Sequence, residues 1–367
     1  MRVLVTADTV GGVWTYTREL VTGLAKRGVE VTLVSFGEIP TNAQSEWLDA
    51  LPGVDFRATA FKLEWMQESA DDLIAASEFL RDIIAEKRPD LLHFSQYCFG
   101  AMDTAVPKVV VAHSDVVSWW VTVHGEEPPT NEWIKGYREV VQRGLDGADT
   151  VVAPSKWMLG QINELYGTRK SGTVIYNGRN PGLFNPHVGK DDLVIAVGRL
   201  WDKAKQVSLL MDASHKVPVW IAGEEQHPDS AFRSDQKLRA RGVRFCGKQS
   251  EAQLRQLFSR ASIYAATSRY EPFGLAPLEA ALSRCAIVAN DIPTFHELWG
   301  ETALYFQHND ARDLARKLER LQNDPELRMT YANLAYGRAR QRFTAERMVD
   351  DYMNLYQTLV PAGVAVA

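Results

Sequence analysis

The chain has 367 residues, of which 46% are hydrophobic and 24% are charged, with a mean hydropathy of −0.22 and a net charge of −5. This composition is typical of a soluble globular protein and excludes a disordered chain, and the acidic balance disfavours nucleic acid as a partner, since its backbone is bound by clustered Lys and Arg. Because single cores stop growing at roughly 250–300 residues, we expect two domains.

The first half of the chain alternates buried strands with amphipathic helices. Residues 2–7 form a β-branched run that predicts a buried strand, and the Gly11-Gly12 turn leads from it into a stretch with helical spacing and a second strand. A longer amphipathic helix is predicted over 70–88, ending before Pro89. Further buried strands are predicted over 91–95, 106–113 and 150–155. Strands that alternate with helices predict a doubly wound parallel sheet.

Residues 177–192 are rich in Gly, Pro and Asn and predict a loop between two domains. The alternation of strand and helix then starts again. Strands are predicted over 193–198, 217–223, 243–247, 262–267 and 285–291, and helices over 206–216, 251–261, 274–284, 310–323, 325–343 and 347–360. The chain therefore predicts two similar α/β halves joined by one linker.

Ligands of open parallel sheets bind outside the carboxyl ends of the strands, so we looked for chemistry there. In SRYEPFGLAPLEA, Pro272 suits the first turn of a helix whose free N–H groups favour an anion. Glu271 precedes this predicted helix and Glu279 lies two turns further along it. Each carboxylate can accept hydrogen bonds from the vicinal hydroxyls of a sugar. The alternative is a capping carboxylate with an ordinary surface glutamate.

Two basic residues follow the strand predicted over 193–198. Arg199 comes directly after it and Lys205 about two turns later, which suits the neutralisation of a diphosphate. The alternative is a pair of solvated surface charges. In the first half, His113 follows a predicted strand and is expected at its carboxyl end, whereas His124 is assigned to the loop HGEEPPTNEW. Either histidine could instead be structural.

Several motifs are absent from the sequence. It contains no Gly-x-Gly, no Asp-x-Asp, no HExxH and no Gly-x-Ser-x-Gly. We therefore expect no nicotinamide chemistry, no nucleoside triphosphate hydrolysis, no metal and no α/β-hydrolase site. The three widely spaced cysteines predict neither a disulfide framework nor a zinc cluster. No run reaches the roughly 18 apolar residues of a spanning helix, and the apolar run at the N-terminus is too short for the core of a signal peptide. We expect a cytoplasmic protein with no membrane association.

Taken together, these residues resemble glycosyltransferase family 4, the retaining, sugar-nucleotide-dependent transferases of GT-B fold. EPFGLAPLEA matches the family's Glu-x7-Glu motif, and supporting matches occur in the same order along nearly the whole chain. They are Gly11-Gly12, VVAPS (151–155), IYNG (175–178), VGRL (197–200) followed by Lys205, WIAGE (220–224) and the ending YMNLYQTLV.

The resemblance implies two Rossmann-like domains that face each other across a cleft. The acceptor-binding domain would span 1–180, completed by the C-terminal helix 341–367, and the nucleotide-sugar-binding domain would span 187–340. It assigns catalytic roles to His113, Arg199, Lys205 and Glu271. It assigns donor binding to Gly12, Gly198, Arg199, Lys205, Glu271, Phe273, Gly274, Leu275 and Glu279, with the diphosphate held by Arg199 and Lys205 and the ribose hydroxyls by Glu279.

The implied reaction moves a hexosyl unit from a nucleotide-diphosphate sugar to a sugar, glycan or small-molecule acceptor, with retention and with neither metal nor cofactor. UDP is the first expectation for the donor, and GDP and ADP are the alternatives. Departures from the family pattern at Pro272, Arg284 and Ala286 affect turns more than charged positions. A sugar-nucleotide epimerase, a phosphorylase and a catalytically silent binding module remain alternatives on the same fold.

Overall fold

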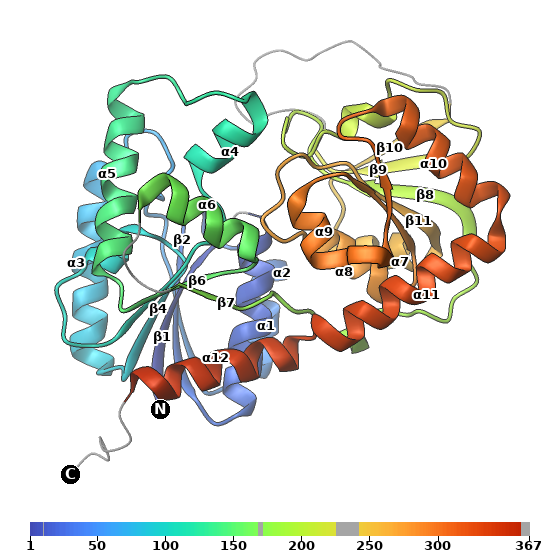
Figure 1. Cartoon of the computed structure of the whole chain (residues 1–367). Helices are drawn as coiled ribbons and strands as arrows, with labels where there is room; N and C mark the ends of the chain where they lie inside the picture. Colours follow the sequence, from blue (N-terminus) through green and yellow to red (C-terminus); the bar gives the residue numbers. More distant parts are fainter. Residues whose placement is uncertain (10, 168–171, 225–241, 361–367) are drawn as a thin grey trace. The chain divides into compact units, whose positions relative to one another are not determined.

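The computed structural model describes residues 1–9, 11–167, 172–224 and 242–360. The chain divides into two compact units, Met1–Gly178 together with the C-terminal segment from Ala345, and Arg179–Thr344. Within the described residues, each unit is built on one parallel sheet with helices packed against it (Figure 1). The predicted α/β fold class is confirmed in both units.

The sheet of the first unit has the strand order β3-β2-β1-β4-β5-β6-β7, and its strand pairs are parallel. The strands are β1 (Arg2–Asp8), β2 (Glu30–Phe36), β3 (Val54–Ala58), β4 (Leu91–Phe94), β5 (Lys108–Val111), β6 (Thr150–Ala153) and β7 (Gly172–Val174). The helices are α1 (Gly12–Lys26), α2 (Asn42–Ser45), α3 (Ala70–Lys87), α4 (Val116–His124), α5 (Glu132–Gly147), α6 (Lys156–Tyr166) and α12 (Ala345–Leu359).

The central strand β1 is buried on both faces, which explains its continuous apolar run. Val3 and Val5 belong to a core that includes residues of α1 and α12, whereas Leu4 belongs to a second core with residues of α3, α5 and α6. Side chains alternate across a strand, so one sheet supplies both cores. The two layers of helices follow from this burial pattern (Figure 1).

A buried cluster of tyrosines and histidine anchors α12 to the first sheet. His93 on β4 has no exposed surface, and its Nδ1 lies 2.7 Å from the hydroxyl of Tyr356 on α12. Its Nε2 lies 3.1 Å from the hydroxyl of Tyr16 on α1. Both ring nitrogens are therefore paired, as buried polar atoms require. Arg27 and Asp350 add an ion pair between α1 and α12.

The sheet of the second unit has the strand order β10-β9-β8-β11-β12-β13, again with parallel pairs. The strands are β8 (Asp191–Val197), β9 (Val219–Ala222), β10 (Val243–Gly247), β11 (Ala261–Ala266), β12 (Ala286–Asn290) and β13 (Leu304–Phe306). The helices are α7 (Glu251–Arg260), α8 (Leu275–Leu282), α9 (Pro293–Trp299), α10 (Ala311–Asn323) and α11 (Pro325–Arg342). Because β8 and β11 are neighbours, the loops that follow them are brought together.

The helix predicted over 206–216 is wrong. Only a 3-10 turn, Val207–Leu210, forms there. A ring nitrogen of His215 lies 2.7 Å from the carbonyl oxygen of Leu210. In a continuing helix, this carbonyl would instead accept a hydrogen bond from a backbone amide. Leu209 and Leu210 are buried without a helix around them.

None of the helices in the described part of the chain combines the length and the apolar character needed to span a bilayer.

Burial lowers the pKa of His93 to about 3, with a smaller contribution from His113, so His93 is neutral in the folded protein at pH 7. An unfolded histidine gains a proton near pH 6.5. The contribution of His93 to stability is therefore complete above pH 6.5 and is lost as the pH falls toward 3. In this range we expect His93 to lower the free energy of unfolding by about 1.4 kcal/mol for each pH unit of acidification.

Urea unfolding of the wild type and of His93→Gln between pH 6.5 and 4.5 measures this effect. Glutamine keeps a donor and an acceptor for the two tyrosines but does not ionise in this range. The free energy of unfolding should fall less steeply with decreasing pH in the variant. Equal slopes would show that His93 is not buried in its neutral form.

Candidate functional site

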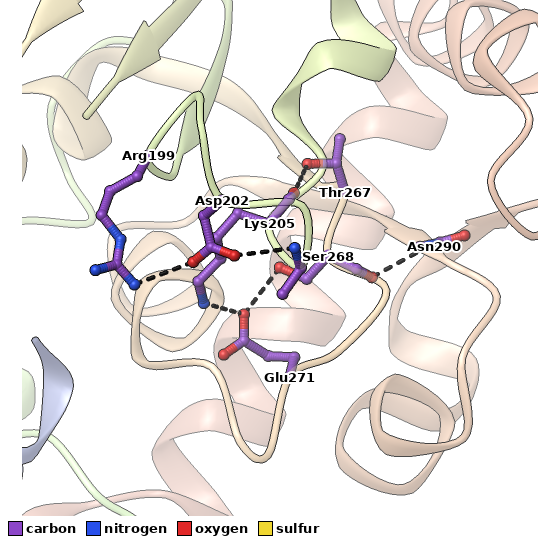
Figure 2. Close-up of polar contacts among 8 residues, drawn as sticks. Arg199, Asp202, Lys205, Thr267, Ser268, Glu271 and Asn290 are labelled. Atoms are coloured by element: carbon purple, nitrogen blue, oxygen red, sulfur yellow. Dashed lines mark hydrogen bonds and ion pairs between the residues drawn. The ribbon is translucent and has the colours of Figure 1, made fainter. Parts of the chain in front are cut away.

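Polar residues gather at the carboxyl ends of two neighbouring strands of the second sheet. Gly198 and Arg199 directly follow β8, and the segment 267–271 follows β11. Two hydrogen bonds join these loops: Thr267 Oγ1 donates to the carbonyl of Lys205 over 2.7 Å, and the amide of Arg269 donates to the carbonyl of Ala204 over 2.9 Å. The loops therefore form one polar cluster (Figure 2).

Lys205 and Glu271 meet in this cluster. Lys205 Nζ lies 2.7 Å from Glu271 Oε2, and Ser268 Oγ donates to the same oxygen over 2.9 Å. The Glu271 side chain is 11% exposed. Among the described residues, its hydrogen bonds go to Oε2, so Oε1 can still accept hydrogen bonds from a ligand (Figure 2). The lysine charge also offsets the cost of burying the carboxylate.

Arg199 is the second basic residue of the cluster. Its Nη2 lies 3.0 Å from Asp202 Oδ2, and its guanidinium lies over the ring of Trp201, 4.5 Å from the ring centre. Asp202 in turn accepts a hydrogen bond from the amide of Ala204 over 2.9 Å. With 42% of its side chain exposed, Arg199 is oriented by its neighbours and still accessible to an anion. Figure 2 shows Arg199 and Lys205 on the same side of this loop.

The glycines beside these residues allow close packing. A Cβ at Gly198 would lie 2.9 Å from Cβ of Lys205, and a Cβ at Gly223 would lie 2.1 Å from the carbonyl oxygen of Gly198. Gly223 also has a φ of +154°. Gly198 was predicted to bind the donor. In the structure it has a packing role, because it leaves room for the aliphatic part of the Lys205 side chain.

The start of α8 differs from the prediction. Pro272 is not in its first turn, because the helix begins at Leu275 and Gly274 is its N-cap. Gly274 has a φ of +89°, a left-handed conformation that a helix cannot continue through. The Phe273 side chain is buried against Phe343, with ring centres 5.5 Å apart, so only its backbone is a candidate ligand group. Glu271 lies before the helix, as predicted.

Glu279 is buried on α8 and contacts Arg179, a residue that the sequence analysis missed. Arg179 Nε lies 2.9 Å from Glu279 Oε1. On β11, burial raises the pKa of Tyr264 far above its usual value, and the charges of Glu271 and Glu279 raise it further. Arg179 follows directly after the IYNG match, but no spacing in the sequence connects it to Glu279.

Asn290 supports the cluster from the neighbouring strand and was also missed. Its Nδ2 donates to the carbonyl of Ser268 over 3.2 Å and to Asn309 Oδ1 over 2.9 Å. These bonds hold the segment that carries Ser268 and Glu271 (Figure 2). A polar residue at the end of a predicted strand was the available signal.

The candidates of the first unit lie at the matching edge of their own sheet. Gly12 is the first residue of α1, after Gly11 with a φ of +77°. His113 follows β5, with its ring 4.5 Å from that of Tyr16. Burial lowers the pKa of His113 to about 3, and its Nε2 has no hydrogen-bond partner among the described residues. His113 is therefore a neutral imidazole at pH 7.

His124 was assigned to a loop, and this is wrong. It is the last residue of α4, and its ring stacks on Trp120 with ring centres 4.4 Å apart. The connection to α5 consists of residues 125–131, so Glu132 and Trp133 are helical. The preceding VVSWW run has no alternating pattern and was not predicted as a helix. Asp115 is its N-cap and accepts a hydrogen bond from the amide of Ser118 over 2.6 Å.

Among the described residues, no group of three or more His, Cys, Asp or Glu side chains is arranged to hold a metal ion.

Two family models together match most of the chain. The model "Glycosyltransferase Family 4" matches residues 10–183, and "Glycosyl transferases group 1" matches residues 184–338. The chain belongs to glycosyltransferase family 4. It is thus a glycosyltransferase of carbohydrate biosynthesis, and the predicted membership of this family is confirmed.

Individual proteins agree with this assignment. The chain is 26% identical to glycogen synthase of Mycobacterium tuberculosis over 373 residues, which cover 92% of this chain and 87% of the relative. Sucrose-phosphate synthase of Thermosynechococcus elongatus has a similar fold, with a TM-score of 0.78 at 18% identity, covering 98% of this chain and 99% of that one. HepE of Anabaena in complex with UDP-glucose gives a TM-score of 0.74 at 16% identity, covering 98% of this chain and all of that one. These neighbours confirm the GT-B fold.

The close contact at Gly198 leads to a prediction. In Gly198→Ala the new methyl group would overlap the stem of Lys205, and overpacking of this kind costs about 1–3 kcal/mol. Urea unfolding should show this loss. Gly189→Ala is the matched control, since a Cβ at Gly189 meets no atom within 4 Å. Equal stability of the two variants would contradict the packing role of Gly198.

Proposed function

We propose that this family 4 enzyme transfers a hexosyl unit from a nucleotide-diphosphate sugar to a hydroxyl of a sugar, glycan or small-molecule acceptor, with retention of the anomeric configuration. Neither a metal nor a cofactor is needed in this proposal. The observation that carries it is the contact between Lys205 and Glu271, 2.7 Å apart. The contact places a cation that can bind the leaving phosphate beside a carboxylate that can accept hydrogen bonds from sugar hydroxyls.

Departure of the nucleoside diphosphate builds negative charge on its phosphates. Arg199 and Lys205 supply two positive charges at one loop, and both are held by acidic neighbours before a ligand binds. Groups that are oriented in advance stabilise a transition state without further reorganisation. In this proposal Arg199 and Lys205 bind the diphosphate, and the backbone of Phe273, Gly274 and Leu275 approaches the donor at the start of α8.

The hydroxyls of the donor are the proposed ligands of the carboxylates. Glu271 would accept hydrogen bonds from the transferred sugar through Oε1, and Glu279 would accept them from the ribose. His113, as a neutral imidazole, can accept or donate a hydrogen bond to a sugar hydroxyl without adding charge. Gly12 would lie against the diphosphate, where a side chain would interfere. Acceptor binding is assigned to the first unit.

Retention needs no carboxylate base. The leaving phosphate can take the proton of the attacking hydroxyl on the same face of the sugar, in contrast to glycosidases, which use a pair of carboxyl groups. Glu271 is already paired with Lys205 and Ser268, which suits a binding role better than proton transfer.

For the donor we propose a UDP-sugar, with GDP- and ADP-sugars as alternatives. The complex of HepE with UDP-glucose supports this choice. The proposed compartment is the cytoplasm. Cys98, Cys246 and Cys285 all carry free thiols, which suits a reducing environment.

Thermal-shift measurements with UDP-glucose, GDP-mannose and ADP-glucose test the donor. We expect one of them to raise the melting temperature, because a ligand that binds only the folded state stabilises it. The sugar acceptor is then identified by incubating the enzyme with that donor and a saccharide panel, and proton NMR of the product gives the anomeric configuration. An inverted product would disprove retention. Epimerised donor without any acceptor would replace the transferase with an epimerase. Consumption of a sugar 1-phosphate in place of the nucleotide sugar, with release of inorganic phosphate, would replace it with a phosphorylase.

Lys205→Met should lower kcat by about 10²–10³-fold, as expected when one oriented charge is removed from a transition state. The methionine keeps the stem but has no charge for the phosphate. Lys203→Met is the matched control, since Lys203 is exposed on the same loop. Turnover is measured by the release of nucleoside diphosphate. If both variants retain wild-type turnover, Lys205 does not stabilise the leaving group.

A further inference from the structure

Arg179 is a fully buried arginine at the first residue of the second unit. Its side chain has no exposed surface, although arginine is among the residues that are rarely buried unless they are paired. It contacts a glutamate on each of two helices, Glu251 at the start of α7 and Glu279 on α8. The chain thus places a permanent positive charge behind one of the two carboxylates of the Glu-x7-Glu motif.

The position of the guanidinium is determined by several contacts. Nη2 lies 2.7 Å from Glu251 Oε1, and Cζ lies 5.5 Å from the centre of the Phe184 ring. The backbone amide of Arg179 donates to the carbonyl of Phe343 over 3.0 Å. With its backbone, its aromatic face and one nitrogen held in this way, the guanidinium presents Nε to Glu279 in one orientation.

Glu279 depends on this partner. The residue is only 9% exposed, and its neighbours Leu278 and Ala280 on α8 have no exposed surface. Burial disfavours the charged form of a carboxyl group. An arginine 2.9 Å away opposes this effect because a guanidinium stays protonated at all accessible pH values. Arg179 therefore offsets part of the cost of burying the Glu279 carboxylate and restricts the direction of its oxygens.

We propose that Arg179 is a positioning residue for the ribose of the donor: it holds the Glu279 carboxylate in the form and direction that select nucleotides bearing ribose hydroxyls. This inference rests on the proposed function, since Glu279 is taken there as the ribose ligand. Arg179 itself touches no substrate. A buried ion pair that served stability alone would leave ribose selection unchanged when it is altered, so selectivity separates the two roles.

The experiment measures nucleotide selectivity by calorimetry. UDP, GDP and ADP are titrated into the wild type, and the one that binds is compared with its 2′,3′-dideoxy form. We expect the wild type to prefer the ribose form by about 10- to 100-fold, the range for hydrogen bonds to a charged group. In Arg179→Met the preference should fall to within about threefold of unity, while the dideoxy form should bind as it does to the wild type.

Two further variants complete the test. Glu279→Gln removes the proposed ligand charge directly and should show the same loss of preference as Arg179→Met. Arg328→Met is the matched control, because Arg328 forms an ion pair with Asp192 in the same unit, 3.2 Å apart, and contacts neither glutamate of the motif. It should keep the wild-type preference for ribose whatever its melting temperature.

Each outcome decides the proposal. An Arg179→Met variant that folds and keeps the wild-type preference overturns it, while nucleotide binding itself leaves the proposed function standing. Absence of binding by all three nucleotides to the wild type overturns both. If Arg179→Met does not fold, Arg179→Lys replaces it: a point charge cannot keep both the Nε and the Nη2 contacts. The preference must then fall at least about threefold, and an unchanged preference overturns the proposal.

Discussion

The contact between Lys205 and Glu271 joins the two loops on which the candidate chemistry depends. Each residue comes from a loop that follows a different strand, and β8 and β11 must be neighbours in one parallel sheet for the loops to meet. The ion pair sets the direction of both side chains and compensates part of the cost of burying the carboxylate. Ser268 and Thr267 tie the same loops together by hydrogen bonds. The site is therefore a property of the strand order as much as of the residues themselves.

The two units control charge in opposite ways. In the second unit, Arg179 and Lys205 form ion pairs with the two buried glutamates of the motif. In the first unit, His93 and His113 have no such partners of opposite charge, and burial keeps both neutral. Neutral histidines in the first unit and cationic side chains at the candidate site of the second unit suit a division in which the second unit would bind the phosphates.

The alternation of strands and helices was predictable from the sequence because the strands are buried on both faces and appear as continuous apolar runs. Arg199 and the segment that carries Glu271 were visible for the same reason, since they follow such runs. The helix over 206–216 was wrong because its apolar residues are close in sequence yet pack without helical hydrogen bonds, with His215 closing the turn. Pro272 was misplaced because the left-handed Gly274 delays the helix.

Contacts between distant segments could not be predicted from the sequence. The partner of Glu279 lies 100 positions away at Arg179, and the support for Ser268 comes from Asn290 on the next strand. No spacing in the sequence predicts either pair, since each depends on how separate elements pack. The strands β7 and β13 have three residues each, too few to show a period, and the VVSWW run of α4 has no polar residues at helical spacing.

The membership of α12 in the first unit has a consequence for biosynthesis. The ribosome synthesises residues up to Gly178 first. Tyr352 and Tyr356, which complete the core around His93, are synthesised only after the whole second unit. At translation rates of about 5–20 residues per second, the nascent first unit waits roughly 10–30 s with part of its apolar surface uncovered. During this interval the emerging chain is a natural client for a chaperone that shields hydrophobic surface.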